Sequence, residues 1–440
     1  MKQTTRWLTA IMAASLLALP LAGCGTKDPA SSSSSTPSSG SSFNTDEKIK
    51  AETGKVSILI PGYDGKEESG VNNAAYNAAV KAFEQKYGKT VEIVQAVGEQ
   101  LWNEKVAAQI AAKEPVDVFA ITVDQYLGMY QKNYLLPVND YVDLGRAKLN
   151  LSAMDTFVKF DGKYYAAGVS VTPYVLYYNK DILSANGYDE DEPMNRYKAG
   201  SWTWDSFVEI ARTCQDDEVG IAGLENMFDE VFQATNLASA VKFENGKYVL
   251  NIKTSEMRNT LEMVQDIFKK NKICGNGYVT GQNKFLKGKA AMHGAYSYEE
   301  AVFSKLKADG TVKFDFGVAP FPVGPDNKEG KNFGHSSGFA ISNGSKSPYS
   351  AGKLIDMILD ELEKKGEEDA AKLMPGSQEL YDTLAKSAYI PSYTDGILEK
   401  GFGAFYLLYD VRNGEDINQK LAQYETTYQK MVDDANALLK

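Results

Sequence analysis

Short apolar runs alternate with helical stretches from residue 55 onward, and this alternation constrains the fold more than any other feature. Lys55–Ile60 has the pattern of a buried strand and ends at Pro61 and Gly62. Asn72–Tyr87 then carries alanine and aromatic residues at helical spacing. The same alternation recurs to about Lys132. Strands that alternate with helices of this length predict βαβ units and a parallel sheet.

The pattern changes in the middle of the chain. Val158–Asn179 is rich in strand-forming residues, with a hairpin turn predicted at Asp161-Gly162. Trp204 is predicted to begin a long helical section that is interrupted only by turns. Three later apolar runs predict further strands: Lys289–His293, Phe314–Ala319 and Phe339–Ser342. From Glu379 onward helical patterns dominate.

The N-terminus has the pattern of an export signal. Lys2 and Arg6 precede the apolar run Trp7–Leu19, which is short for a membrane-spanning helix. The residues that follow, Leu21-Ala22-Gly23-Cys24, resemble the lipobox of bacterial lipoproteins. This resemblance implies removal of residues 1–23 and a diacylglycerol lipid on Cys24. We therefore expect a protein anchored by lipid at the extracellular face of a cell membrane, in a Gram-positive organism.

Residues 24–53 are predicted to be the lipidated cysteine and a disordered tether. Its serine-rich part, Gly25–Ser42, cannot bury a core and has a reach on the order of 25 Å. The remaining chain, from about Gly54 to Lys440, is too long for one core and predicts two lobes.

Charge and metal-ligating residues exclude several kinds of site. The net charge of −11 argues against a nucleic-acid partner and against an anionic membrane patch. Only two histidines and three cysteines are present, so a zinc site is not expected, and no cofactor is predicted. Cys214 and Cys274 could form a disulfide or remain two buried thiols.

Six ordered motifs resemble one family, the family 1 extracellular solute-binding proteins of ABC transporters, which includes the maltose-binding protein. They are Pro115-Val116-Asp117-Val118-Phe119, Leu135–Tyr141, Asp161–Tyr165 with Leu176–Asp181, Trp202–Phe207, Phe285–Met292 and Gly338–Ser345. Each motif is weak alone, but together, behind a lipobox and a tether, they are specific.

The resemblance implies an α/β fold of the periplasmic-binding-protein-like type II class, with a hinge and a ligand cleft between two lobes. The first lobe is expected to hold residues 54–165 and about 290–335. The second is expected to hold about 175–285 and 340–440. The implied partners are a carbohydrate ligand and an ABC permease in the membrane, and the protein is expected to be a monomer.

Sugar recognition needs aromatic rings for the apolar sugar face and polar groups for the hydroxyls. We looked for such residues near the ends of predicted strands and helices. The candidate ligand-binding residues are Tyr63, Asp64, Thr122, Trp202, Tyr296, Ser297 and Ser336. Trp204 and Asp117 are instead expected to serve packing and structure. Tyr296 is the strongest candidate.

Two departures from the family pattern leave the ligand open. Where the family usually has tryptophan after the Ala-Ala-Met segment, this chain has Gly294–Tyr298, and Ala167-Gly168-Val169 replaces the usual Gly-x-Pro. The sequence therefore does not name the sugar, and a peptide, a polyamine or another polar solute remains an alternative.

Enzyme alternatives have little support in the sequence. Gly334–Gly338 fits the Gly-x-Ser-x-Gly pattern of a hydrolase nucleophile, but no histidine follows position 335 to act as its base. A glycosidase needs a pair of carboxylates, and none of the 58 acids is singled out as one. A glycan-displaying adhesin without transport is a third alternative. The sequence favours a binding protein without catalytic residues.

Overall fold

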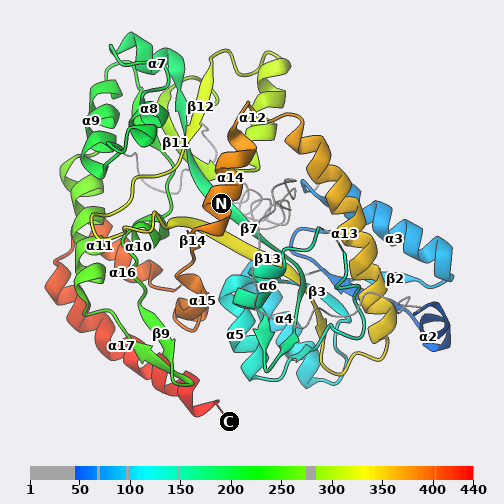
Figure 1. The fold of residues 1–440 in the computed structure, drawn as a ribbon. Helices are drawn as coiled ribbons and strands as arrows, with labels where there is room; N and C mark the ends of the chain where they lie inside the picture. Colours follow the sequence, from blue (N-terminus) through cyan, green and yellow to red (C-terminus); the bar gives the residue numbers. More distant parts are fainter. Residues whose placement is uncertain are drawn as a thin grey trace, which may run out of the picture.

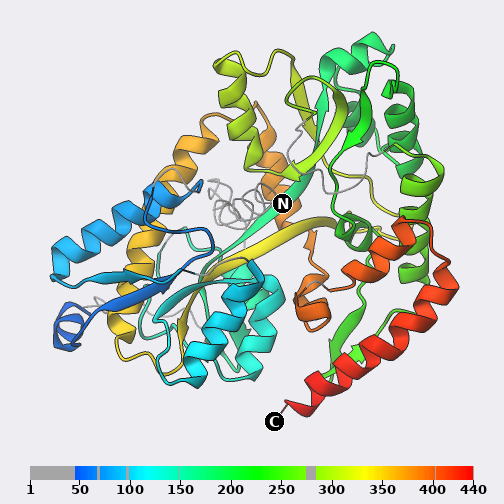
Figure 2. The same ribbon diagram turned by 180° about the vertical axis from the view of Figure 1, so that it is seen from behind.

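A computed structural model describes residues 45–66, 70–95, 99–146, 148–273, 284–401 and 403–439. The predicted signal peptide, Cys24, residues 25–44 of the predicted tether and Cys274 lie outside these residues. The end of the predicted tether is ordered instead: Asp46–Ala51 forms a helix, Ile49 is fully buried and Glu52 accepts hydrogen bonds from Ser350, so the folded part begins before Gly54. The fold has two parts, which long strands join at the centre of the molecule (Figures 1 and 2). Within the described residues, no helix has both the length and the apolar character needed to cross a membrane.

The first stretch of chain forms the predicted βαβ units. Strands β1, β2 and β3 pair in parallel, as the sequence predicts, and β5 and β6 form the predicted hairpin. The elements are α2 (Asp46–Ala51), β1 (Val56–Leu59), α3 (Asn73–Tyr87), β2 (Val91–Ile93), α4 (Glu99–Ala111), β3 (Val118–Thr122), α5 (Val123–Gln131), β4 (Leu135–Leu136), α6 (Leu151–Phe157), β5 (Lys159–Phe160) and β6 (Lys163–Tyr164).

The middle of the chain begins with a single strand of 13 residues, β7, which is buried along its whole length. It contains β7 (Ala167–Asn179), α7 (Lys180–Ala185), α8 (Glu192–Lys198), α9 (Trp204–Cys214), β8 (Ala222–Glu225), α10 (Glu230–Thr235), β9 (Val241–Glu244), β10 (Lys247–Leu250), α11 (Ser255–Gln265), the π-helix η3 (Asp266–Lys270), β11 (Ala290–Tyr296), α12 (Glu299–Ala308) and β12 (Phe316–Ala319).

The last stretch begins with a second long strand, β13, and is otherwise mainly helical. Its elements are β13 (Asn332–Ser342), α13 (Pro348–Ala370), α14 (Ser377–Lys386), β14 (Ala388–Tyr389), α15 (Ser392–Asp395), the short 3-10 helix η4 (Glu399–Gly401), α16 (Phe405–Arg412) and α17 (Ile417–Ala437). The large sheet follows the order β2-β1-β3-β13-β7-β11-β8, with β4, β12 and β14 paired beside this path.

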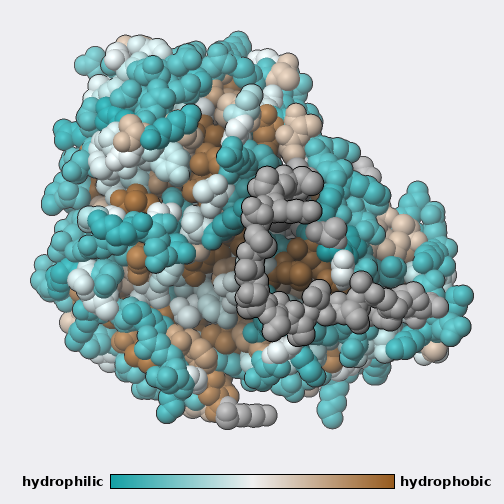
Figure 3. Space-filling model, in the orientation of Figure 1, coloured by the Kyte–Doolittle hydropathy of each residue, from teal (hydrophilic) through white to brown (hydrophobic). Residues whose placement is uncertain are grey.

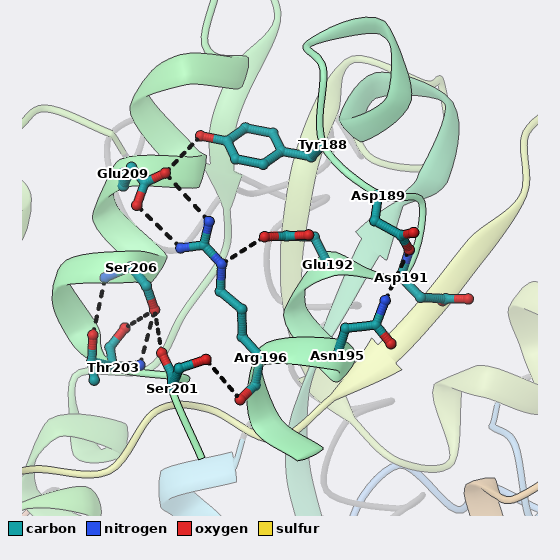
Figure 4. A network of polar contacts seen from close by, with 10 residues as sticks. All are labelled: Tyr188, Asp189, Asp191, Glu192, Asn195, Arg196, Ser201, Thr203, Ser206 and Glu209. Carbon is teal, nitrogen blue, oxygen red and sulfur yellow. Dashed lines mark hydrogen bonds and ion pairs between the residues drawn. The ribbon is translucent and has the colours of Figure 1, made fainter. Parts of the chain in front are cut away.

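Helix α9 shows how local sequence sets an element's start. The Thr203 side chain accepts a hydrogen bond from the backbone N–H of Ser206, and the Ser206 hydroxyl lies 2.9 Å from the backbone N–H of Thr203. This reciprocal pair satisfies donors that the first turn leaves free. Arg196 of α8 then joins the two helices, at 3.1 Å from Glu209 of α9 and 2.7 Å from Glu192 (Figure 4).

Two separate hydrophobic cores divide the described chain into lobes. The first lobe's core draws on residues 56–171 and 339–362, and α13 packs on α3 within it. The second lobe's core draws mainly on residues 174–333 and 398–432, with a smaller cluster under α12 and α14. Strands β7 and β13 contribute side chains to both lobes. They are therefore the connections between the lobes.

This packing differs from the expected division of the later segments. Strand β11 pairs with the second half of β7 and with β8, so residues from about 290 belong to the second lobe. Conversely, β13 pairs with β3 and α13 packs on α3, so residues from about 340 to 370 belong to the first lobe. The expectation failed because sequence order alone does not show which half of a long strand a later strand will join.

Two local predictions are also corrected. The section after Cys214 was expected to be helical, but it contains strand β8 and a hairpin of β9 and β10 around Asn245 and Gly246. The Gly334–Gly338 segment was interpreted as a loop before a strand, yet it lies inside β13 and pairs with β7. It is therefore not a strand-to-helix nucleophile turn. Cys214 is a buried thiol, and burial raises its pKa to about 11.

Candidate functional site

The carboxyl ends of strands from both lobes meet at one place. In the first lobe, the last residue of β3, Thr122, pairs with Ser337 of β13. In the second lobe, the last residue of β11, Tyr296, pairs with Tyr174 of β7. Strands β7 and β13 pair with each other between these points, and we call residues 170–174 and 333–337 the crossing. Ligands on α/β sheets bind beyond the carboxyl ends of strands, so the crossing is the candidate site.

A group of aromatic rings surrounds the crossing on the side of the second lobe. Tyr174 lies at its centre, with ring centroids 5.0 Å from Phe228 and 5.1 Å from Tyr296. Tyr296 and Tyr298 stack with an interplanar angle of 16°. We define the aromatic cluster as Tyr174, Phe228, Tyr296, Tyr298, Phe321 and Phe333. Figure 3 shows apolar surface gathered in the hollow between the two parts of the molecule.

Local backbone geometry positions this cluster. Strands β8 and β11 are parallel neighbours, so the segments that follow them, which carry Phe228 and Tyr298, leave the same edge of the sheet. Asn226 adopts a positive φ of 59° and its side-chain amide donates to the carbonyl of Gly294 at 2.8 Å. A Cβ on Gly294 would lie 2.7 Å from the carbonyl oxygen of Asn226. The close approach that brings Phe228 beside Tyr296 therefore requires glycine at position 294.

Two titratable side chains accompany the rings. Glu230 begins α10, and its Oε2 is buried without a partner among the described residues. Burial raises the pKa of Glu230 to about 7. His335 of β13 lies 6.3 Å from the Tyr296 ring, and burial lowers the His335 pKa to about 4. The imidazole is therefore neutral near pH 7, and its Nε2 also has no partner among the described residues.

A cavity of about 380 Å³ adjoins the crossing. Its walls come from both lobes: α6 and the end of α13 on one side, and α14 with the segment that follows β11 on the other. Val171, Thr172 and Pro173 of the crossing reach it, together with Ser297 and Tyr298. The volume falls within the range of small-molecule pockets, so a compact solute can be accommodated beside the crossing.

Four of the seven predicted site residues lie at or beside the crossing. Tyr296 is part of the aromatic cluster, and Ser297 lines the cavity. Ser336 is fully buried in β13, with its hydroxyl 3.4 Å from that of Tyr126. Thr122 ends β3 and its hydroxyl donates to Asp124 at 2.6 Å. Because Ser336 and Thr122 are buried, they stabilise the strands of the site and are not exposed to a solute.

The other three predicted residues lie elsewhere. Tyr63 is only 2% exposed and donates its hydroxyl hydrogen to Asn77 at 2.8 Å in the first lobe's core. Asp64 accepts the backbone N–H of Lys66 in the turn that follows β1. Trp202 donates its indole N–H to the carbonyl of Pro320 at 2.8 Å and packs in the second lobe's core. Tyr63 and Trp202 are therefore packing residues in this structure.

Sequence reasoning missed Tyr174, Phe228 and Glu230 as site residues. Phe228 and Glu230 follow β8, which the sequence did not reveal as a strand. Tyr174 lies inside the long β7 and has no strand end near it in the sequence. The expected packing role of Trp204 agrees with its place in the second lobe's core, and Asp117 accepts hydrogen bonds from Ser57 and Ser345. No group of residues suited to a metal ion occurs in the described part of the chain.

Comparison with known proteins relates this geometry to a family. A model of the family of bacterial extracellular solute-binding proteins matches residues 67–364, which is more than half of the chain. A curated relative, the maltodextrin-binding protein MdxE of Bacillus subtilis (strain 168), is 23% identical over 449 residues and covers 94% of each chain.

Solved structures share the fold at low identity. The substrate-binding protein of Listeria monocytogenes in complex with cycloalternan aligns with a TM-score of 0.65 and 16% identity, covering 88% of this chain and 99% of that one. The galacto-N-biose- and lacto-N-biose I-binding protein of Bifidobacterium longum aligns with a TM-score of 0.66 and 16% identity, covering 87% of this chain and 97% of that one. The fold is therefore the predicted type II class, and the chain belongs to the bacterial extracellular solute-binding protein family.

Proposed function

We propose that this protein is the substrate-binding component of an ABC importer and captures a mono- or oligosaccharide outside the cell membrane. The aromatic cluster at the crossing carries the proposal, because its rings offer flat apolar faces at the carboxyl ends of strands. The sugars bound by the relatives named above support the carbohydrate class.

The crossing also suits capture by lobe movement. Strands β7 and β13 pair along Gly334–Ser337 and Ser170–Pro173, so they join the lobes as a two-stranded ribbon. A solute that contacts both lobes stabilises the arrangement in which the lobes lie closest. The size of this effect is set by the difference between its affinities for the closed and the open arrangement. A permease in the membrane would then recognise the loaded form. The protein acts as a monomer and performs no catalysis in this proposal.

A thermal-shift screen of the purified protein against a panel of glycans tests the function. We expect a saturable rise in the melting temperature with one class of sugar and no change in the sugar itself. Chromatography of the incubated glycan provides the second measurement. Release of a shortened or altered glycan would overturn the binding role in favour of a hydrolase, and stabilisation only by peptides or polyamines would overturn the carbohydrate class.

We also propose that the mature chain is anchored through lipid on Cys24 and is held away from the membrane by residues 25–44. The order of signal, small residues, cysteine and serine-rich segment supports this. Expressed in a Gram-positive host, the full chain should partition into detergent, whereas a Cys24→Ala variant should not. Cys214→Ala is the matched control and should partition like the unaltered chain. Equal partitioning of all three proteins would contradict the proposed lipid anchor on Cys24.

A further inference from the structure

The surroundings of Glu230 narrow the class of sugar, and this inference rests on the function proposed above. We propose that the preferred solute is a sugar that bears an ammonium group, held between the Glu230 carboxylate and the aromatic cluster. The amino group of an amino sugar is the simplest example.

Among the described residues, Glu230 has neither a basic partner like that of Asp229 nor the several donors that surround Asp395. Its neighbour Asp229 is paired with Arg412 at 3.0 Å. Asp395 of α15 accepts backbone N–H groups of Ala240 and Val241 at 2.9 and 2.8 Å, and also the side-chain amide of Gln233. Glu230 Oε2 meets no donor in the described part of the chain; Asp229 Oδ2 meets none either, but Arg412 balances the charge of Asp229. A buried carboxylate oxygen without a donor costs free energy that a ligand can recover.

Charges near Glu230 also disfavour its ionised form. Asp229 and Asp395 both disfavour its ionised form, and burial is the largest cause of its raised pKa. Across the site, His335 is neutral near pH 7 and adds no positive charge. Arg412 faces Asp229, and its guanidinium also lies 3.8 Å from the ring centroid of Phe268. A cationic group on the solute would therefore meet negative potential at this position.

The aromatic rings also favour a positively charged group on the solute. Glu230 contributes to the raised pKa of Tyr296, which places the carboxylate within electrostatic range of that ring. Tyr298 and Phe228 remain partly exposed beside it, with Phe228 6.0 Å from Tyr296 between ring centroids. The faces of aromatic rings attract ammonium groups, and they do so more strongly where water is excluded. A carboxylate beside several ring faces is therefore better matched to an ammonium group than to a hydroxyl group alone.

Matched glycans test the inference by isothermal titration calorimetry at pH 7. The probes are three oligosaccharide sets of equal length and linkage, built from glucosamine, N-acetylglucosamine and glucose. The wild-type protein should bind the glucosamine set about tenfold or more tightly than the other two, because only that set carries the ammonium group. Glu230→Gln keeps the side-chain shape and should abolish this preference. Glu209→Gln, at a surface acid of the same lobe, should retain it.

The outcomes separate this inference from the function on which it rests. Tighter binding of the neutral or N-acetylated sets would overturn the ammonium preference and leave the sugar-binding function intact. An amine preference that survives in Glu230→Gln would overturn the role of Glu230. If no glycan in the panel binds, the proposed function itself fails. The melting curve of each variant shows whether it is folded before its affinity is compared.

Discussion

Two acids, one in each lobe, differ in how far hydrogen-bond donors satisfy their carboxylates. Asp117 in the first lobe accepts hydrogen bonds from the backbone N–H and hydroxyl of Ser57, at 2.8 and 2.9 Å, and from the hydroxyl of Ser345 at 2.6 Å. Glu230 in the second lobe keeps one oxygen without a donor among the described residues. The first acid stabilises the scaffold, whereas the second is the one proposed above to meet the solute. The two acids therefore place the proposed recognition of the solute in the second lobe.

The largest effect is expected from removing the base that pairs with Asp229, the neighbour of Glu230. Arg412→Met leaves Asp229 buried without its partner, so the free energy of unfolding should fall by about 3–5 kcal/mol. Urea denaturation measures the change. Arg196→Met, at a more exposed ion pair with Glu209, is the control and should cost less than about 1 kcal/mol. Equal losses in the two variants would show that the buried ion pair beside α10 stabilises the protein no more than the exposed one.

A second test compares the two acids directly. Glu230 has its pKa raised from 4.5 to about 7, so the folded state binds the proton more tightly than the unfolded state, and stability falls as the pH rises through this window. Glu230→Gln removes the ionised form and should stabilise the ligand-free protein at pH 8, by up to about 3 kcal/mol. The gain should vanish near pH 4, where the carboxyl is protonated in both states.

Asp117→Asn is the matched variant in the first lobe. Ser57 and Ser345 donate to different carboxylate oxygens, and the amide nitrogen that replaces one of them cannot accept a hydrogen bond, so this variant should be less stable by about 1–3 kcal/mol. Melting temperatures measured across the pH range compare the two variants. Changes of the same sign at pH 8 would contradict the distinction between a scaffold acid and a ligand-facing acid.

A third test concerns affinity rather than stability. Tyr296→Ala removes a ring from the aromatic cluster and should weaken binding of the glycan found in the screen by about 2 kcal/mol, or roughly 30-fold. Calorimetry measures this loss, and Tyr197→Ala, an exposed ring on α8, should leave affinity unchanged. Unchanged affinity in Tyr296→Ala would place the solute away from the aromatic cluster.

The sequence predicts the parts of this fold that depend on local patterns. The βαβ units of the first lobe are visible because each strand and helix has its own apolar period, and the hairpin at Asp161-Gly162 has a turn signature. Strand β8 was missed because it has only four residues, and Gly223 within it is pressed against the backbone of Ala211. Packing against α9, the helix that precedes it, thus stabilises a strand that has little intrinsic tendency to form.

The site is less visible in the sequence than the fold. Tyr296 was found because it ends an apolar run. Tyr174 and Phe228 lie 122 and 68 residues before it, and only the pairing of β11 with β7 and β8 brings them beside it, which the sequence does not show. Glu230 carries no local signal, because its significance depends on which donors fail to reach it in three dimensions. The pairing of β7, β8 and β11 therefore determines which residues come together at the candidate site.

The way in which β13 and α13 complete the first lobe has a consequence for how the protein is made. Most of that lobe's core is present by residue 171, yet it also needs residues 339–362, which follow the bulk of the second lobe in the chain. Closing so long a loop carries an entropic cost, and contacts this distant in sequence form slowly. A chain that is exported in an extended form and stopped before residue 339 would leave the first lobe without part of its core. Such a shortened chain should therefore be cut by proteases more readily than the full chain.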